Sequence, residues 1–138
     1  MKSSEYHREM KKKMRSLSCV FCQWEQLAII LENDLAVGFK DTHPVSKGHL
    51  LIIPKQHRTN YFDLSEAELL AINKLIHSGK ELLDHQFAPD GYNIGVNVGK
   101  YGGQTVMHCH FHVIPRYIGD DLHPAGGIRK LLPKGQEK

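Results

Sequence analysis

Three histidines alternate with apolar residues between positions 106 and 114, in the run Val-Met-His-Cys-His-Phe-His-Val-Ile. Alternate side chains of a β-strand share a face, so His108, His110 and His112 are expected on one face. Imidazole titrates near neutral pH, and a neutral histidine can attack phosphorus to form a covalent intermediate. The spacing predicts a reactive histidine face, and the other face is expected to pack into the core through Met107, Cys109, Phe111 and Val113.

The segment before these histidines reads Gly102-Gly103-Gln104-Thr105 and predicts a loop that approaches a ligand closely. Two glycines leave room for the ligand, while Gln104, Thr105 and the backbone N–H groups are available to phosphate oxygens. The segment lacks the Gly-Lys-Ser/Thr element of a Walker A loop. A phosphate-bearing substrate therefore fits the loop and the histidines together, without the machinery of an ATPase.

The elements that must position this strand follow a simple order along the chain. Apolar runs at 27–31 and 35–39 around a polar turn predict a hairpin, and 49–53 reads as a buried strand that Pro54 ends. Ser65 and Glu68 form a capping-box pattern, and the apolar spacing behind them predicts a helix to about His85. With further strands at 92–98 and 105–114, the pattern is α+β, one long helix against an antiparallel sheet.

Composition limits the class of protein. The chain has 138 residues, enough for one domain, and 41% hydrophobic and 24% charged residues are typical of a globular protein. A net charge of +3 is too small for a nucleic-acid binder, and no apolar run approaches the ~20 residues of a membrane span. Residues 1–16 read as a basic tail or loose helix with no signal-peptide pattern, so we expect a cytoplasmic protein.

An odd number of cysteines, three, argues against a disulfide framework. Cys19 and Cys22 form a Cys-x-x-Cys pair, which inside a cell indicates metal or redox chemistry. Cys109 is expected to be a buried thiol because it points away from the histidine face.

With these motifs the sequence resembles the histidine-triad (HIT) family. Residues 108–114 match the signature of three histidines each followed by an apolar residue, with a further apolar residue at the end. A second block, residues 48–57 (Gly-His-Leu-Leu-Ile-Ile-Pro-Lys-Gln-His), matches another family motif, and Asn97 stands where the family places an amide side chain. The resemblance implies a HIT domain over residues 17–118, a C-terminal arm over 119–138, and a five-stranded antiparallel sheet extended by homodimerisation.

The resemblance also implies roles for individual residues. His110 would be the nucleophile, with His112 and His49 as its supporting histidines. The substrate-binding residues would be Asn97, Gln104 and Thr105 at the phosphates, Asp41 at the ribose, and Val20, Phe21, Phe39 and Leu51 at the base. Some members of the family hold structural zinc on a Cys-x-x-Cys pair and two histidines, which here would be Cys19, Cys22, His57 and His108. No organic cofactor is expected.

The implied activity is hydrolysis at the α-phosphate of a nucleotide through a nucleotidyl-histidine on His110. Pro115-Arg116 and Gly119-Asp120 favour the dinucleoside polyphosphate hydrolases of the family. A nucleoside phosphoramidase, which the short chain favours, and a nucleotide-binding adaptor with vestigial activity stay open as alternatives. The expected partners are a small nucleotide and a second copy of the chain, with neither nucleic acid nor membrane. The C-terminal arm is a hypothetical determinant of the leaving group.

Overall fold

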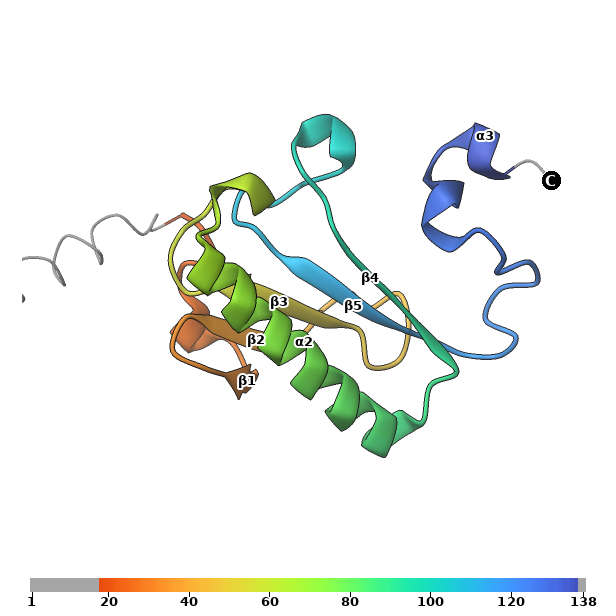
Figure 1. Cartoon of the computed structure of the whole chain (residues 1–138), viewed down its shortest axis with the longest axis horizontal. Coiled ribbons are helices and arrows are strands. Elements are labelled where there is room, and N and C mark those ends of the chain that lie inside the picture. Colours follow the sequence, from red (N-terminus) through yellow and green to blue (C-terminus); the bar gives the residue numbers. More distant parts are fainter. Residues whose placement is uncertain (1–17, 137–138) are drawn as a thin grey trace, which may run out of the picture.

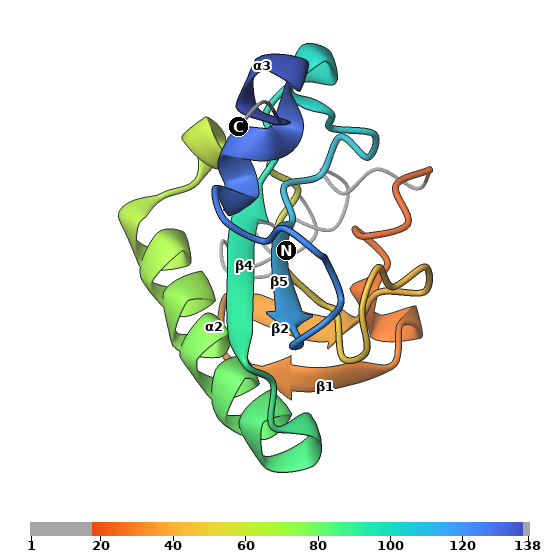
Figure 2. The same cartoon turned by 90° about the vertical axis from the view of Figure 1, so that its right-hand side faces the viewer.

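The computed structural model describes residues 18–136, so the expected basic tail at 1–16 lies outside the described residues. Its sheet consists of five antiparallel strands in the order β1-β2-β3-β5-β4, and the long helix α2 lies against one face of it (Figures 1 and 2). The strands are β1 (Ile29–Glu32), β2 (Ala36–Lys40), β3 (Leu50–Pro54), β4 (Gly91–Val96) and β5 (Phe111–Arg116), and the α-helices are α2 (Glu66–Phe87) and α3 (Pro133–Gln136). Short 3₁₀-helices lie at Trp24–Gln26, Tyr61–Asp63, Lys100–Gly102 and Gly127–Leu131. The predicted α+β fold is confirmed.

Local side-chain chemistry explains where the first elements begin and end. The Asn33 side chain accepts the backbone N–H groups of Leu35 and Ala36 and donates to the carbonyl of Ala71, which shapes the β1–β2 turn and fastens it to α2. Ser65 and Glu68 form the predicted capping box at the start of α2. The helix ends two residues later than expected, at Phe87, followed by Ala88 in the left-handed conformation.

The sheet is buried on both of its faces. One cluster lies between the sheet and α2 and includes Leu50, Ile52 and Val113. The other lies on the opposite face, where the segment that carries Phe21 covers Val37, Phe39, Leu51 and Ile53. Strand β3 is buried at every position because it faces both clusters, which explains its unbroken apolar sequence. No helix of the described residues is long and apolar enough to cross a membrane.

The histidine strand is shorter than expected. Regular pairing begins at Phe111 rather than at residue 105, and residues 106–108 form a bend. The side-chain alternation nevertheless holds from His108 onward, because Cys109, Phe111 and Val113 all lie in the cluster beneath α2. The expectation that Met107 packs in the core is wrong: it is 44% exposed, since the bend turns it away.

Candidate active site

A cavity of about 650 Å³ opens on the sheet face opposite α2, beside the cluster that contains Phe21, Phe39 and Leu51. It is lined by the expected catalytic residues His110 and His112 and by most of the expected substrate-binding residues: Val20, Phe21, Phe39, Asp41, Leu51 and Thr105. Its apolar end is completed by Leu27, Ala28 and Ile30, which the sequence analysis missed. Strand alternation alone could not have identified Ala28 and Ile30, because the register of the first strand is irregular after Ile29. Ile29 packs in the cluster around Phe21, whereas Leu31 packs in the cluster beneath α2. An apolar end beside a few convergent polar groups is typical of a small-molecule site.

His110 lies at the floor of this cavity with one ring nitrogen fixed. Its Nδ1 is 2.9 Å from the carbonyl oxygen of His108, and a carbonyl can only accept, so Nδ1 carries the proton. The neutral ring therefore has its lone pair on Nε2. Phe21 packs against the ring, with the two centroids 5.3 Å apart, and only 8% of His110 is exposed. The ring is rigidly held, as a nucleophile should be.

A second chain of hydrogen bonds fixes His49 and His112. The backbone N–H of Val45 donates to Nδ1 of His49 at 3.2 Å, which leaves the proton of the neutral ring on Nε2. That nitrogen lies 2.9 Å from Nδ1 of His112, so His112 accepts there and carries its own proton on Nε2. Asp41 Oδ2 is 3.5 Å from the same nitrogen of His49. This series of hydrogen bonds ends at His112, whose Nε2–H is a donor in the cavity beside the lone pair of His110.

Burial keeps both supporting histidines neutral. Burial, with smaller contributions from the neighbouring rings of His110 and His49 and against an opposing effect of Asp41, lowers the pKa of His112 to about 4. Burial also lowers the pKa of His49, although Asp41 acts in the opposite direction. Because Nε2 of His49 is protonated in this neutral network, His49 and His112 form a hydrogen-bonded pair with Asp41 beside it, rather than a metal site.

Two expected phosphate ligands lie elsewhere than at the cavity wall. Gln104 is buried: its amide nitrogen donates to the carbonyls of Thr59 and Val106, and its oxygen accepts from the N–H of Gly99. Its side chain is fully used in joining three segments, which makes it a positioning residue. Asn97 is half-buried beside Gly103, outside the residues that line the cavity.

The backbone of the histidine segment is also held by residues that sequence reasoning missed. The N–H of Cys109 donates to the carbonyl of Arg58, and the Arg58 side chain is paired with buried Glu68 at 2.9 Å. Glu68 is the capping-box residue of α2, so the start of the helix anchors the strand that carries His110. The capping-box pattern identifies Glu68 in the sequence as a helix-start residue, but nothing in the sequence pairs Glu68 with Arg58.

The four expected metal ligands converge beside this segment, with their ligand atoms within 4.8 Å of one another. Nδ1 of His108 is 3.5 Å from the sulfur atoms of both Cys19 and Cys22, and Nδ1 of His57 is 3.1 Å from Cys22. Nε2 of His108 donates to the Pro54 carbonyl, which leaves Nδ1 unprotonated and directed at the sulfurs. Ligand atoms around tetrahedral zinc lie roughly 3.5 Å apart. The four residues fit a closed zinc site.

Cys109 has no part in either site. Burial raises the pKa of its thiol to about 12, and its side chain lies in the core beneath α2. A thiol that stays protonated is a poor nucleophile and a poor metal ligand.

The HIT domain family model matches residues 25–119. An uncharacterised HIT-like protein of Methanocaldococcus jannaschii is 37% identical over 74% of this chain and 81% of its own. The adenosine 5'-monophosphoramidase of Schizosaccharomyces pombe is 35% identical over 72% of this chain and 75% of its own.

Solved structures share the fold as well as the sequence. A zinc-bound histidine triad family protein of Mycobacterium smegmatis superposes with a TM-score of 0.70 at 33% identity, covering 77% of this chain and 80% of that one. The Plasmodium falciparum diadenosine triphosphate hydrolase gives a TM-score of 0.64 at 32% identity, over 67% and 63% of the two chains. The sequence match over residues 25–119 agrees with the shared sheet, and the chain belongs to the HIT domain family.

Proposed function

We propose that this protein hydrolyses dinucleoside polyphosphates at the α-phosphate through a covalent nucleotidyl-histidine on His110. The observation that carries the proposal is the lone pair on Nε2 of His110, which the Nδ1 contact to the His108 carbonyl leaves free in a cavity of nucleotide size. The HIT family supplies nucleotide-binding hydrolases, and one structural relative is named a diadenosine triphosphate hydrolase.

The reaction has two displacements. Nε2 of His110 attacks the α-phosphorus, a P–N bond forms, and the bond from phosphorus to the leaving-group oxygen breaks. The N–H on Nε2 of His112 is available to a phosphate oxygen or to the departing oxygen. Water then attacks phosphorus, the P–N bond breaks, and the lone pair returns to His110 with release of a nucleoside monophosphate.

The remaining cavity residues divide between base and ribose. Phe21 and Phe39, whose ring centroids are 5.5 Å apart, would hold the base together with Val20 and Leu51. Asp41, 17% exposed, would accept from the ribose hydroxyls. Thr105 lines the cavity and would contact the α-phosphate. Asn97 lies beside Gly103, in the glycine-bearing segment before the histidines.

Zinc on Cys19, Cys22, His57 and His108 would stabilise the fold and take no part in the reaction, since four protein ligands leave no open position for water. His57 and His108 would tie the segment around Cys19 to the strand that carries His110. The support is the tetrahedral spacing of the four ligand atoms and the zinc-bound structural relative.

A phosphoramidase is the second candidate, because one relative of known activity is an adenosine 5'-monophosphoramidase. Both activities share the attack by His110 and differ only in the leaving group, an amine instead of a phosphate.

A substrate panel tests the proposal: diadenosine triphosphate and tetraphosphate, a nucleotide sugar and adenosine 5'-phosphoramidate. We expect the highest kcat/KM for a diadenosine compound, with release of AMP. A phosphoramidate turned over faster than any diadenosine compound would instead favour the second candidate. Binding of nucleotides without turnover of any substrate would contradict both hydrolase functions and favour a nucleotide-binding adaptor.

A further inference from the structure

A strip of bare sheet leads away from His112. Gly95 of β4 pairs directly with His112 of β5, and directly paired residues project from the same face of a sheet. A Cβ built on Gly95 would meet nothing within 4 Å. The missing side chain therefore leaves the surface beside the catalytic histidines open along β4.

The next pair on the same face leads into a second cavity. Asn93 pairs with Ile114, two residues beyond His112, and both line a hollow of about 660 Å³. Its other lining residues are Val45, Ser46, Arg116, Asp120, Asp121, Leu122 and His123. Ile114 is four residues from His110, or roughly 13 Å along an extended strand. The hollow thus lies within reach of a long substrate anchored at His110.

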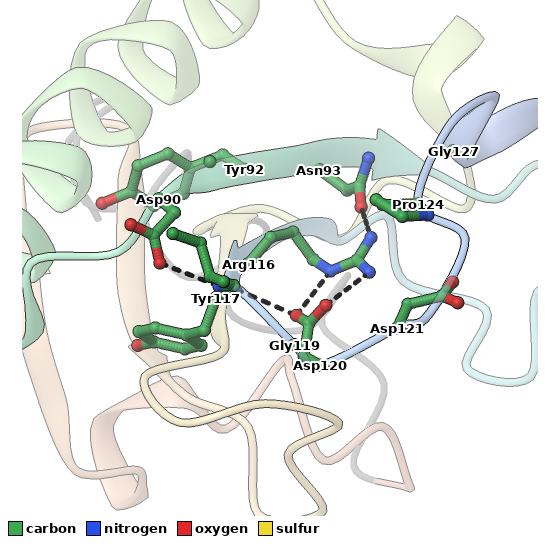
Figure 3. A pocket seen from close by; sticks show the side chains of 12 residues that line it. Asp90, Tyr92, Asn93, Arg116, Tyr117, Gly119, Asp120, Asp121, Pro124 and Gly127 are labelled. Carbon is green, nitrogen blue, oxygen red and sulfur yellow. Dashed lines mark hydrogen bonds and ion pairs between the residues drawn. The ribbon is translucent and has the colours of Figure 1, made fainter.

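The Arg116 side chain holds the start of the C-terminal arm beside this hollow. Figure 3 shows its contacts in an adjoining pocket that shares Asn93, Arg116, Asp120 and Asp121 with the hollow. The guanidinium donates to Asp120 through Nε and Nη2, both at 2.9 Å, and to Asn93 through Nη1 at 2.6 Å. Asp120 also accepts the backbone N–H of Tyr117 at 3.0 Å. These contacts fasten the first turn of the arm to β4 and β5, so that Leu122 and His123 form a wall of the hollow.

The charges in the hollow are largely compensated. Arg116 is paired with Asp120, and Asp121 lies 3.8 Å from Lys130. What remains is an apolar surface from Val45, Ile114 and Leu122 beside the polar groups of Asn93 and His123. Such a mixture suits a flat, uncharged group with hydrogen-bonding edges better than a phosphate chain.

We propose that this hollow holds the distal nucleoside of a dinucleoside polyphosphate, the one that departs with the leaving group. The inference rests on the proposed function: the proximal nucleoside occupies the cavity at Phe21 and Phe39, and the phosphates cross the bare strip at Gly95. The arm then selects the leaving group through Leu122 and His123.

The test compares two substrates that share the proximal half, diadenosine tetraphosphate and adenosine 5'-tetraphosphate, which lacks the distal nucleoside. The double variant Leu122→Ser/His123→Ala on the arm addresses the subsite, and Gly95→Val addresses the strip that the phosphates of both substrates cross. Leu132→Ala is the matched control, an exposed arm residue outside the hollow. The measurement is the ratio of kcat/KM for the two substrates.

We expect the ratio to favour the diadenosine compound in the wild type and to fall about tenfold in the double variant, while Leu132→Ala keeps the wild-type ratio. Gly95→Val should lower kcat/KM for both substrates alike, because both carry the phosphates that cross the strip. If Gly95→Val fails to fold, the double variant, which changes exposed residues only, decides. An unchanged ratio in the double variant, with both substrates cleaved, overturns the subsite and leaves the proposed function intact. Failure of the wild type to cleave either substrate overturns the proposed function, and the subsite with it.

Discussion

The chemistry of this site depends on which nitrogen of each histidine carries the proton. A backbone carbonyl fixes Nδ1–H on His110, and a backbone N–H at Val45 fixes Nε2–H on His49. These two tautomers place a lone pair on Nε2 of His110 and an N–H donor on Nε2 of His112, both in the same cavity. Backbone groups cannot change protonation state near neutral pH, so the pairing is stable where side-chain partners would titrate.

Protonation of His112 predicts a pH-dependent stability. The pKa of His112 is lowered to about 4 in the folded chain, below the ~6.5 of an unfolded histidine. The unfolded state therefore binds the proton first as the pH falls, and this contribution to the free energy of unfolding declines from about pH 7 toward pH 4. His49 acts in the same direction. Urea denaturation at a series of pH values should show the decline, with a shallower slope in His112→Asn.

The matched control is His85→Asn, an exposed position on α2 far along the chain from the cavity. We expect it to keep the wild-type slope between pH 7 and pH 5. Identical slopes in wild type and His112→Asn would contradict the account of a neutral, buried His112.

At the scale of elements, the residues on either side of strand β3 contact both the histidines of the cavity and the proposed zinc site. Gly48 and His49 precede β3, and His57 and Arg58 follow it. His49 orients His112, while His57 joins the proposed zinc site and the Arg58 carbonyl accepts the N–H of Cys109. A change in the packing of β3 against α2 should therefore also shift the residues that line the cavity.

Gly48→Ala tests how closely the residue before β3 packs against α2. Gly48 has φ +90°, and an added Cβ would lie 2.8 Å from Leu83 and 3.0 Å from Phe87 on α2. Strain and overpacking together should cost about 2–3 kcal/mol of unfolding free energy. Gly102→Ala is the control, because nothing lies within 4 Å of its added Cβ and its φ is not positive. Equal stability of the two variants by urea denaturation would show that the contact with α2 is unimportant.

Metal removal tests the cluster that joins the Cys19 segment to the histidine strand. Elemental analysis of untagged protein should give about one zinc per chain, and chelation should lower the melting temperature because a bound ion stabilises the folded state. Cys22→Ser should lose the metal and melt near the chelated wild type. Metal-free protein whose melting temperature does not respond to a chelator would contradict the zinc proposal.

At the scale of the whole molecule, β4 forms one edge of the sheet and pairs only with β5 among residues 18–136. An edge strand with unpaired backbone groups is a template for another strand, and Ile94 on it is 44% exposed. The expected homodimer would join two sheets here. Light scattering should give a dimer for the wild type and a monomer for Ile94→Lys. A monomeric wild type would contradict the expected homodimer.

The sequence predicted the fold well because its signals were local. The alternation at residues 108–113, the capping box at Ser65 and the unbroken apolar strand at 50–53 each constrain one element by itself. The cluster of the four expected metal ligands could be predicted because their types and spacing match a known family pattern. The hydrogen bonds of Gln104 could not be predicted, because a polar residue before the histidines can contact phosphate or backbone carbonyls, and only the packing of residue 59 distinguishes these.

Other features were beyond sequence reasoning because they join distant segments. The Arg58–Glu68 pair, the Val45 contact to His49 and the clamp between Arg116 and Asn93 each depend on how elements pack. The bend that exposes Met107 has no turn signal of its own, since it arises where the strand leaves β3.

The central claim is that Nε2 of His110 becomes covalently bonded to phosphorus. Rapid acid-free quenching during turnover of diadenosine tetraphosphate, followed by intact-mass spectrometry, should show the chain with one added adenylyl group in the wild type. His110→Ala should show neither the adduct nor turnover. Turnover in the wild type with no adduct at any quench time, or an adduct that persists in His110→Ala, would contradict the account.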